Sequence, residues 1–277
     1  MIRRFILFGA LTILLNSAKS QSCCEPGAID LYARNGASEQ FRGAHELPQP
    51  YVHISENGKD INFKTPDGKD AHGWFIPAKK KSDYFLFVIH EWWGLNDHIK
   101  REAEKYWSDL GINVLALDLY DGVVAATREE AGKTMQSLNN ERAVNIIKGA
   151  YEYAGKKARV FSVGWCFGGG WSLQTGLLGG KNLAGTLMYY GQPEKDVAKL
   201  KTLNADVIGF FGSKDQWPSV QMVNEFKDNM EKAGKKLFLN MYDAEHAFAN
   251  PSNPNFNEEA TKDSYAKSIA FIKERMK

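Results

Sequence analysis

The 277-residue chain is long enough to bury a substantial core, and one domain of this size is common among α/β proteins. Hydrophobic residues make up 43% of the chain and charged residues 25%, as in an ordinary globular protein. The 35 basic and 33 acidic residues nearly balance, which gives no reason to expect nucleic acid or an anionic membrane as a partner.

Residues 1–20 are typical of a secretory signal peptide, which the mature protein would lack. Two arginines precede an almost unbroken apolar run from Phe5 to Leu15, and Ala18 and Ser20 fit the −3 and −1 positions of a cleavage site. A short membrane anchor is the alternative, although the run is too short to span a bilayer comfortably. The sequence therefore predicts an exported protein, periplasmic or secreted.

Two of the three cysteines, Cys23 and Cys24, are neighbours just beyond this segment. Adjacent cysteines bond to each other only in a strained ring, so they either pair with another chain or stay reduced. Lipidation of Cys23 is a further alternative, although the three residues before it match the preferred lipoprotein box poorly. We expect no membrane attachment unless Cys23 is lipidated.

Residues 21–50 show no sustained period and are predicted to form a tether or a strapped-down arm. A regular pattern begins at Tyr51, and residues 51–277 are predicted to form a single domain without repeats. Residues 60–65 and 70–76 flank Pro66-Asp67-Gly68, a strong turn signal, and therefore predict a β-hairpin.

Buried-type strands then alternate with amphipathic helices. Short apolar runs predict strands at Tyr84–Ile89, Asn113–Leu117, Arg159–Val163, Ala184–Tyr190, Val207–Phe211 and Lys236–Met241. Helices are predicted at about 97–110, 127–153, 169–178, 219–233 and 258–276. This alternation implies an α/β protein with a mostly parallel central sheet that is flanked by helices on both faces.

The segment Gly164-Trp165-Cys166-Phe167-Gly168 joins a predicted strand directly to a predicted helix. It is a G-x-nucleophile-x-G elbow with cysteine at the nucleophile position. Glycine is needed two residues to either side, because side chains there would clash in the tight turn. The amino end of the helix favours a thiolate and offers N–H groups to an oxyanion. A chance turn around a buried structural cysteine is the alternative, whereas a dinucleotide fingerprint would need glycine in place of Cys166.

Candidate acid and base residues follow the elbow in the order that this turn requires. Asp215 comes directly after a predicted strand, where it can orient a histidine, whereas Asp206 and Asp243 follow strand ends less cleanly. His246 is the only histidine after both the nucleophile and the acid, and a neutral imidazole there can take the thiol proton and later activate water. The alternatives are an aspartate in a surface turn and a solvated loop histidine.

From about residue 52 to the C-terminus the chain resembles the dienelactone hydrolase family of α/β hydrolases. The match lies in four segments that occur in the same order. These are His90-Glu91-Trp92-Trp93-Gly94, Asp118-Leu119-Tyr120, the elbow, and the loops of Asp215 and His246. The resemblance implies the α/β-hydrolase fold and a hydrolase that cleaves a carboxylic ester or lactone through a Cys-His-Asp triad and a thioester.

The resemblance also implies roles for three residues around the triad. Glu91 is expected to contact the resting Cys166 until substrate displaces it, and the amides of Trp92 and Phe167 are expected to form the oxyanion hole.

Two departures from the family bear on the substrate. Family members carry arginines that clamp a substrate carboxylate at the positions of Gly122 and Asn250. We therefore expect a neutral ester or lactone. The candidate substrate-binding residues are Trp93, Trp165, Trp217, Tyr120 and Asn250, although the tryptophan rings can equally fill the core.

No metal or other cofactor is predicted, because the sequence lacks His-Glu-x-x-His and paired Cys-x-x-Cys motifs. One alternative is a non-catalytic member of the fold that binds a ligand or a partner. Another is a redox protein that uses Cys23 and Cys24 in an oxidising compartment. The sequence does not predict the oligomeric state.

Overall fold

The computed structural model describes residues 27–276, so the predicted signal peptide, Cys23 and Cys24 lie outside the described residues. Within them, eight strands form one sheet in the order β1-β2-β4-β3-β5-β6-β7-β8. The hairpin strands β1 (Lys59–Lys64) and β2 (Asp70–Ile76) are antiparallel to each other, β2 is antiparallel to β4, and all other neighbours are parallel. The predicted α/β-hydrolase fold, with its mostly parallel sheet, is confirmed.

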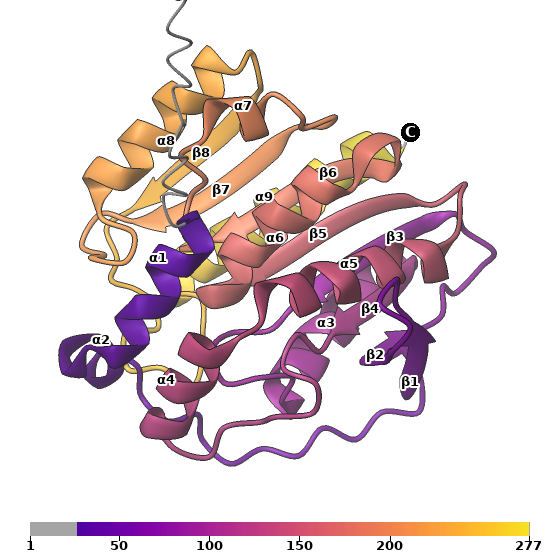
Figure 1. Cartoon of the computed structure of the whole chain (residues 1–277), viewed down its shortest axis with the longest axis horizontal. Coiled ribbons are helices and arrows are strands. Elements are labelled where there is room, and N and C mark those ends of the chain that lie inside the picture. The colour runs from indigo at the N-terminus through magenta and orange to yellow at the C-terminus, as the bar shows by residue number, and fades with distance from the viewer. Residues whose placement is uncertain (1–26, 277) are drawn as a thin grey trace, which may run out of the picture.

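Strands and helices alternate after the hairpin (Figure 1). The parallel strands are β3 (Tyr84–Ile89), β4 (Asn113–Leu117), β5 (Arg159–Trp165), β6 (Leu183–Tyr189), β7 (Val207–Gly212) and β8 (Leu237–Tyr242). The helices of this part are α3 (Asp97–Leu110), α4 (Arg128–Ser137), α5 (Asn140–Ala154), α6 (Phe167–Leu178), α7 (Val197–Leu200), α8 (Val220–Lys232) and α9 (Glu258–Arg275). Helices α3 and α9 pack together on one face of the sheet, and α5 and α6 on the other.

The central strands are apolar because both of their faces are covered. All residues of β3 from Leu86 to Ile89 are fully buried, as are Val114 to Leu117 of β4. A parallel strand that is buried on both faces reads as a continuous apolar run rather than as an alternating one. This is why these strand positions could be predicted almost to the residue.

The single helix predicted at 127–153 is wrong, because the chain breaks there into α4 and α5. Leu138 has an extended backbone, with ψ 125°, and the side chain of Asn139 accepts a hydrogen bond from the Arg142 amide at 3.0 Å. Asn139 therefore caps a new helix instead of continuing the old one.

Residues 27–50, called the N-terminal arm below, contain helices that the sequence did not predict. Helix α1 (Ala28–Arg34), a 3-10 turn at Asn35–Ala37 and helix α2 (Glu39–Gly43) follow one another, and α1 packs against α4 and α6 (Figure 1). Tyr32 and Phe41 of the arm are almost completely buried. These helices are too short to show a helical period in the sequence, and packing on the domain stabilises them.

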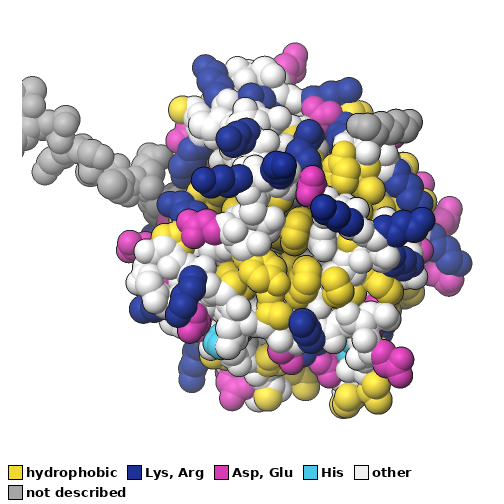
Figure 2. Space-filling view, turned by 90° about the vertical axis from the view of Figure 1, so that its right-hand side faces the viewer, with side chains coloured by type: hydrophobic (Ala, Val, Ile, Leu, Met, Phe, Trp, Pro, Cys, Tyr) yellow, Lys and Arg dark blue, Asp and Glu magenta, His cyan; other side chains and the backbone are white. Residues whose placement is uncertain are grey.

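The surface reflects the balanced composition. Figure 2 shows the side of the molecule away from α1 and α2, where lysines, arginines and acidic residues are interspersed around a group of hydrophobic side chains. Within residues 27–276, no helix combines the length and the apolar character that crossing a membrane requires.

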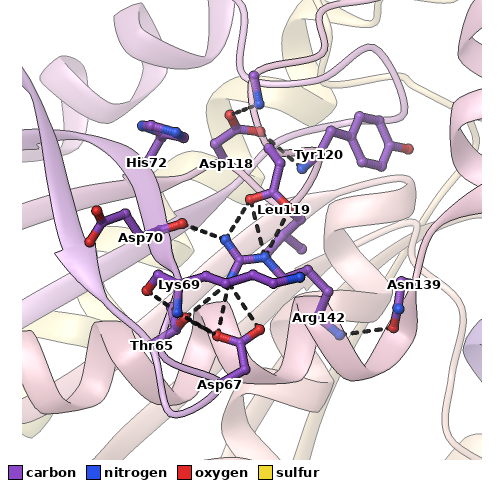
Figure 3. Close-up of polar contacts among 12 residues, drawn as sticks. Thr65, Asp67, Lys69, Asp70, His72, Asp118, Leu119, Tyr120, Asn139 and Arg142 are labelled. Atoms are coloured by element: carbon purple, nitrogen blue, oxygen red, sulfur yellow. Dashed lines mark hydrogen bonds and ion pairs between the residues drawn. The ribbon is translucent and has the colours of Figure 1, made fainter.

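Arg142 on α5 links the hairpin to the loop that follows β4 (Figure 3). Its guanidinium donates to the Asp121 carboxylate at 2.7 and 2.9 Å, to Asp67 at 3.3 Å and to the Asp70 carbonyl at 2.6 Å. Only 10% of the Arg142 side chain is exposed. The planar guanidinium group can donate to all of these acceptors at once. Arg142 therefore fixes the loop that carries Tyr120.

Replacing Arg142 with lysine is expected to lower the free energy of unfolding by about 1 to 2 kcal/mol, because an ammonium group cannot serve all of these acceptors at once. Urea unfolding followed by tryptophan fluorescence measures the change. Arg159→Lys, at an exposed position that starts β5, is the matched control and should leave the midpoint unchanged. Equal midpoints for the two variants would contradict this role of Arg142.

Candidate active site

Cys166 lies where β5 turns abruptly into α6. Its backbone has φ 55° and ψ −120°, a conformation that a residue with a side chain adopts only under constraint. A Cβ atom added to Gly164 would lie 2.1 Å from the carbonyl oxygen of Gly168. One added to Gly168 would lie 2.4 Å from the carbonyl oxygens of Ile89 and His90. The turn therefore requires glycine at both positions, as predicted, and it holds the sulfur at the carboxyl edge of the sheet.

Asp215 and His246 form a buried pair close to this turn. Asp215 follows β7 and His246 follows β8, and Nδ1 of His246 donates to Oδ2 of Asp215 at 2.8 Å. Although burial by itself lowers the pKa of His246, the Asp215 carboxylate raises it well above the ordinary value. The two other aspartates considered for this role lie in exposed or partly exposed ion pairs instead, Asp206 with Arg275 and Asp243 with Lys214.

The structure brings Cys166 and His246 together with a residue of the arm, His45. The sulfur of Cys166 and one ring nitrogen of each histidine all lie within 4.8 Å of one another, and all three residues are buried. Nε2 of His246 has no hydrogen-bond partner among the residues that the structure describes. The predicted nucleophile, base and acid therefore share one site, and a second histidine joins them.

Two side chains of the arm lie within hydrogen-bonding distance of the Cys166 sulfur. The Tyr32 hydroxyl lies 3.1 Å from Sγ, and Nε2 of His45 lies 3.5 Å from it. Nδ1 of His45 lies 2.6 Å from the Phe41 carbonyl oxygen, which only accepts, so Nδ1 carries the proton and Nε2 can only accept. The thiol therefore donates to His45, and Tyr32 donates to the sulfur.

The pKa values of these neighbours agree with that assignment. Burial lowers the pKa of His45 to about 3, helped by the charges of His246 and Arg128, so the imidazole stays neutral. Burial and the neighbouring Cys166 raise the pKa of Tyr32 well above its ordinary value, so the phenol keeps its proton.

Among the described residues, no hydrogen bond joins Glu91 to Cys166, although the resemblance implies a contact between them. Glu91 instead accepts a hydrogen bond from Nδ2 of Asn250 at 2.7 Å, while the arm residues Tyr32 and His45 occupy the hydrogen-bonding positions around the sulfur. Sequence reasoning missed both arm residues because they belong to no motif and precede the region of resemblance. The one available signal was that His45 is one of only six histidines.

Burial raises the pKa of the Glu91 carboxyl to about 7, although the charge of His246 and the hydrogen bond from Asn250 oppose the shift. Glu91 is therefore a buried carboxyl whose ionisation lies near neutral pH.

The amides of Trp92 and Phe167 are free for an oxyanion. Phe167 is the first residue of α6, whose first amides have no acceptor within the helix. Neither amide donates a hydrogen bond to another residue in the described part of the chain. Both residues are buried, so a negative oxygen placed there would be shielded from water.

The candidate substrate-binding residues do not all reach one cavity. A small pocket of about 30 Å³, partly open to solvent, is lined by Trp165 and Asn250 together with Glu91, Tyr190, Arg101 and Glu102. Trp93 packs edge-on against Trp92 with ring centroids 4.8 Å apart, Tyr120 packs on Phe167 at 5.1 Å, and Trp217 packs on Phe41 at 5.4 Å. These three rings line no part of that pocket in the described conformation.

Comparison with known proteins places this geometry in context. The model of the dienelactone hydrolase family matches residues 74–276. Carboxymethylenebutenolidase 1 of Cupriavidus pinatubonensis is 26% identical over 202 residues, covering 68% of this chain and 84% of that protein. Carboxymethylenebutenolidase of a Pseudomonas species is 28% identical over 216 residues, covering 73% and 88%.

Among solved structures, a dienelactone hydrolase-like promiscuous phosphotriesterase from metagenomic libraries superposes with a TM-score of 0.68. It is 19% identical, and the match covers 79% of this chain and 98% of that one. At this identity the likeness concerns the fold.

Glu91→Gln is expected to remove a pH dependence of stability. Below pH 4.5 the Glu91 carboxyl is neutral in both the folded and the unfolded state, but between pH 4.5 and about 7 only the unfolded state ionises freely. The wild type should therefore lose on the order of 3 kcal/mol relative to the variant as pH rises through this window.

Urea unfolding at pH 4.5 and pH 8 measures the difference. Glu245→Gln, which removes an exposed carboxyl beside His246, is the control and should follow the wild type. Parallel pH profiles for wild type and Glu91→Gln would contradict the buried, ionisable state of Glu91.

Proposed function

The chain belongs to the dienelactone hydrolase family and is a hydrolase, and we propose that it cleaves a neutral carboxylic ester or lactone with Cys166 as its nucleophile. The observation that carries the proposal is a cysteine on a strained turn whose sulfur lies within 4.8 Å of a histidine, itself oriented by a buried aspartate.

The proposed reaction begins when His246 takes the proton of Cys166. The Asp215 carboxylate stabilises the imidazolium that results, and the thiolate attacks the carbonyl carbon of the substrate. The carbonyl oxygen becomes negative and accepts hydrogen bonds from the Trp92 and Phe167 amides. The alcohol leaves with the proton from His246, and Cys166 remains as a thioester.

Water completes the cycle. His246 takes a proton from a water molecule, which attacks the thioester, and the returning proton restores the thiol as the acid leaves. Thiolate is a better leaving group than alkoxide, so the first intermediate tends to return to the ester. A lactone whose ring opening drives the step forward is therefore a favoured substrate.

The charges around the pocket support a neutral substrate. Gly122 and Asn250 occupy the positions at which the family carries carboxylate-binding arginines, and the pocket brings Glu91 and Glu102 towards a bound ligand. Its one arginine, Arg101, lies 3.4 Å from the Glu102 carboxylate and stacks on the Tyr51 ring, so the charges of Arg101 and Glu102 offset each other. A carboxylate on the substrate would therefore find no unpaired arginine in the pocket.

Turnover requires the arm to move. Only 1% of Cys166 is exposed in the described conformation, and Tyr32 and His45 occupy the positions through which a carbonyl carbon would approach the sulfur. The described structure is thus a closed, resting form. The proposal also includes export, which the signal-like residues 1–20 support.

Cys166→Ala and Cys166→Ser are expected to reduce hydrolysis of p-nitrophenyl acetate by at least about 10³-fold, because neither variant can form the thioester. Mass spectrometry of the wild type, quenched during turnover, should find one acyl group on Cys166. Circular dichroism of both variants checks that the fold persists. Full activity in Cys166→Ala would refute the proposed nucleophile, and a folded wild type without any turnover would favour a ligand-binding member of the fold.

A panel of matched lactones tests the substrate class. The value of kcat/KM is expected to be about tenfold or more higher for a neutral lactone than for the same ring bearing a carboxylate, a difference of about 1.4 kcal/mol. Because salt screens charge repulsion, raising the ionic strength should reduce the difference in kcat/KM between the two lactones. A preference for the carboxylate would contradict the neutral-substrate proposal.

A further inference from the structure

Three buried metal-ligating side chains converge from distant parts of the chain. Cys166 comes from the elbow, His246 from the loop after β8 and His45 from the arm, and one ligand atom of each lies within 4.8 Å of the other two. Hydrolysis by the proposed route uses Cys166 and His246 but leaves His45 without a chemical task. A cysteine sulfur and two imidazoles are the ligands that borderline-soft divalent ions prefer.

Each imidazole is already oriented in the way that metal-binding histidines are. Nδ1 of His45 donates to the Phe41 carbonyl at 2.6 Å, and Nδ1 of His246 donates to the Asp215 carboxylate at 2.8 Å. A hydrogen bond from one ring nitrogen to a carbonyl or carboxylate fixes the tautomer and leaves the lone pair of the other nitrogen for the metal. Nε2 of His246 is buried and has no partner among the described residues, so no protein group competes with an ion for this atom.

We propose that the closed arm completes a Zn²⁺ site in which Sγ of Cys166 and the Nε2 atoms of His45 and His246 are the protein ligands. In a tetrahedral zinc site, bond lengths of about 2.3 Å to sulfur and 2.0 to 2.1 Å to nitrogen place those two atoms about 3.6 Å apart. Sγ and Nε2 of His45 are 3.5 Å apart in the structure. Three protein ligands leave the fourth position to water.

Binding of the ion displaces the protons of its ligand atoms and one hydrogen bond. The thiol proton and any proton on Nε2 of His246 leave to solvent, the bond between the thiol and His45 is lost, and one zinc–sulfur and two zinc–nitrogen bonds form without any oxidation or reduction. The site needs His45, because a cysteine and a single histidine supply only two ligands.

The ion would also link the arm to the domain. Because His45 lies on the arm, bound zinc holds the closed form, whereas access of an ester to Cys166 requires the open one. Zinc and substrate should therefore exclude each other. This consequence rests on the proposed function, whereas the metal binding itself does not.

The test uses the full chain with Cys23→Ser and Cys24→Ser, which leaves Cys166 as the only thiol. Zinc affinity is measured by competition with a chromophoric chelator, and Co²⁺ is used as a probe because a cobalt–thiolate bond gives a charge-transfer absorption. We expect one ion per chain and a thiolate band. Cys166→Ser should abolish the band, and His45→Gln should weaken zinc binding by more than about 100-fold, beyond the loss of about 10- to 100-fold that removal of a mere supporting hydrogen bond causes.

His72→Gln is the matched control, because His72 is an exposed histidine on β2 whose loss should leave zinc affinity unchanged. Equal affinities of the parent and His45→Gln, or cobalt bound without the thiolate band, would overturn the proposal. If His45→Gln does not fold, the alkylation rate of the parent protein tests the metal site instead. Zinc should slow the reaction of Cys166 with iodoacetamide, and an unchanged rate would refute the site.

Hydrolysis is assayed separately, once with chelator and once with zinc. A protein that binds zinc but cleaves no ester would refute the proposed function alone. One that cleaves esters at the same rate with and without zinc would refute the metal site alone.

Discussion

The tight turn at Cys166 is the constraint on which the rest of the site depends. Gly164 and Gly168 approach backbone oxygens so closely that any side chain at either position would force the turn open. Because β5 lies between β3 and β6, the turn is anchored in the middle of the sheet. The loops after β3, β7 and β8 end at the same edge, which is why Trp92, Asp215 and His246 can surround one sulfur atom.

Two histidines lie beside this sulfur, and the pKa of each one depends on the burial of its ring and on the group that accepts a hydrogen bond from its Nδ1. His246 has a buried carboxylate behind it, which raises its pKa and makes it ready to accept a proton. His45 has only a backbone carbonyl behind it, and burial keeps its pKa low, so it remains a neutral acceptor. In the proposed mechanism, the thiol transfers its proton to His246 and not to His45.

Glu91 illustrates how burial can outweigh a hydrogen bond. Its carboxyl accepts from the side-chain amide of Asn250, which carries no charge. Burial then dominates, and its pKa rises to about 7. The charge in the pocket thus depends on pH near neutrality.

The sequence by itself determined the sheet, the elbow and the order of the catalytic candidates. Buried parallel strands are continuous apolar runs, and the glycines around Cys166 follow from local sterics, so both could be recognised without any knowledge of distant contacts. Only the tertiary structure decided what lies against the sulfur. The arm has no period of its own, and its helices exist because Tyr32 and Phe41 are buried on the domain. The hydrogen bond between His45 and Cys166 and the one between Asn250 and Glu91 join residues more than 100 positions apart, and no local pattern encodes such contacts.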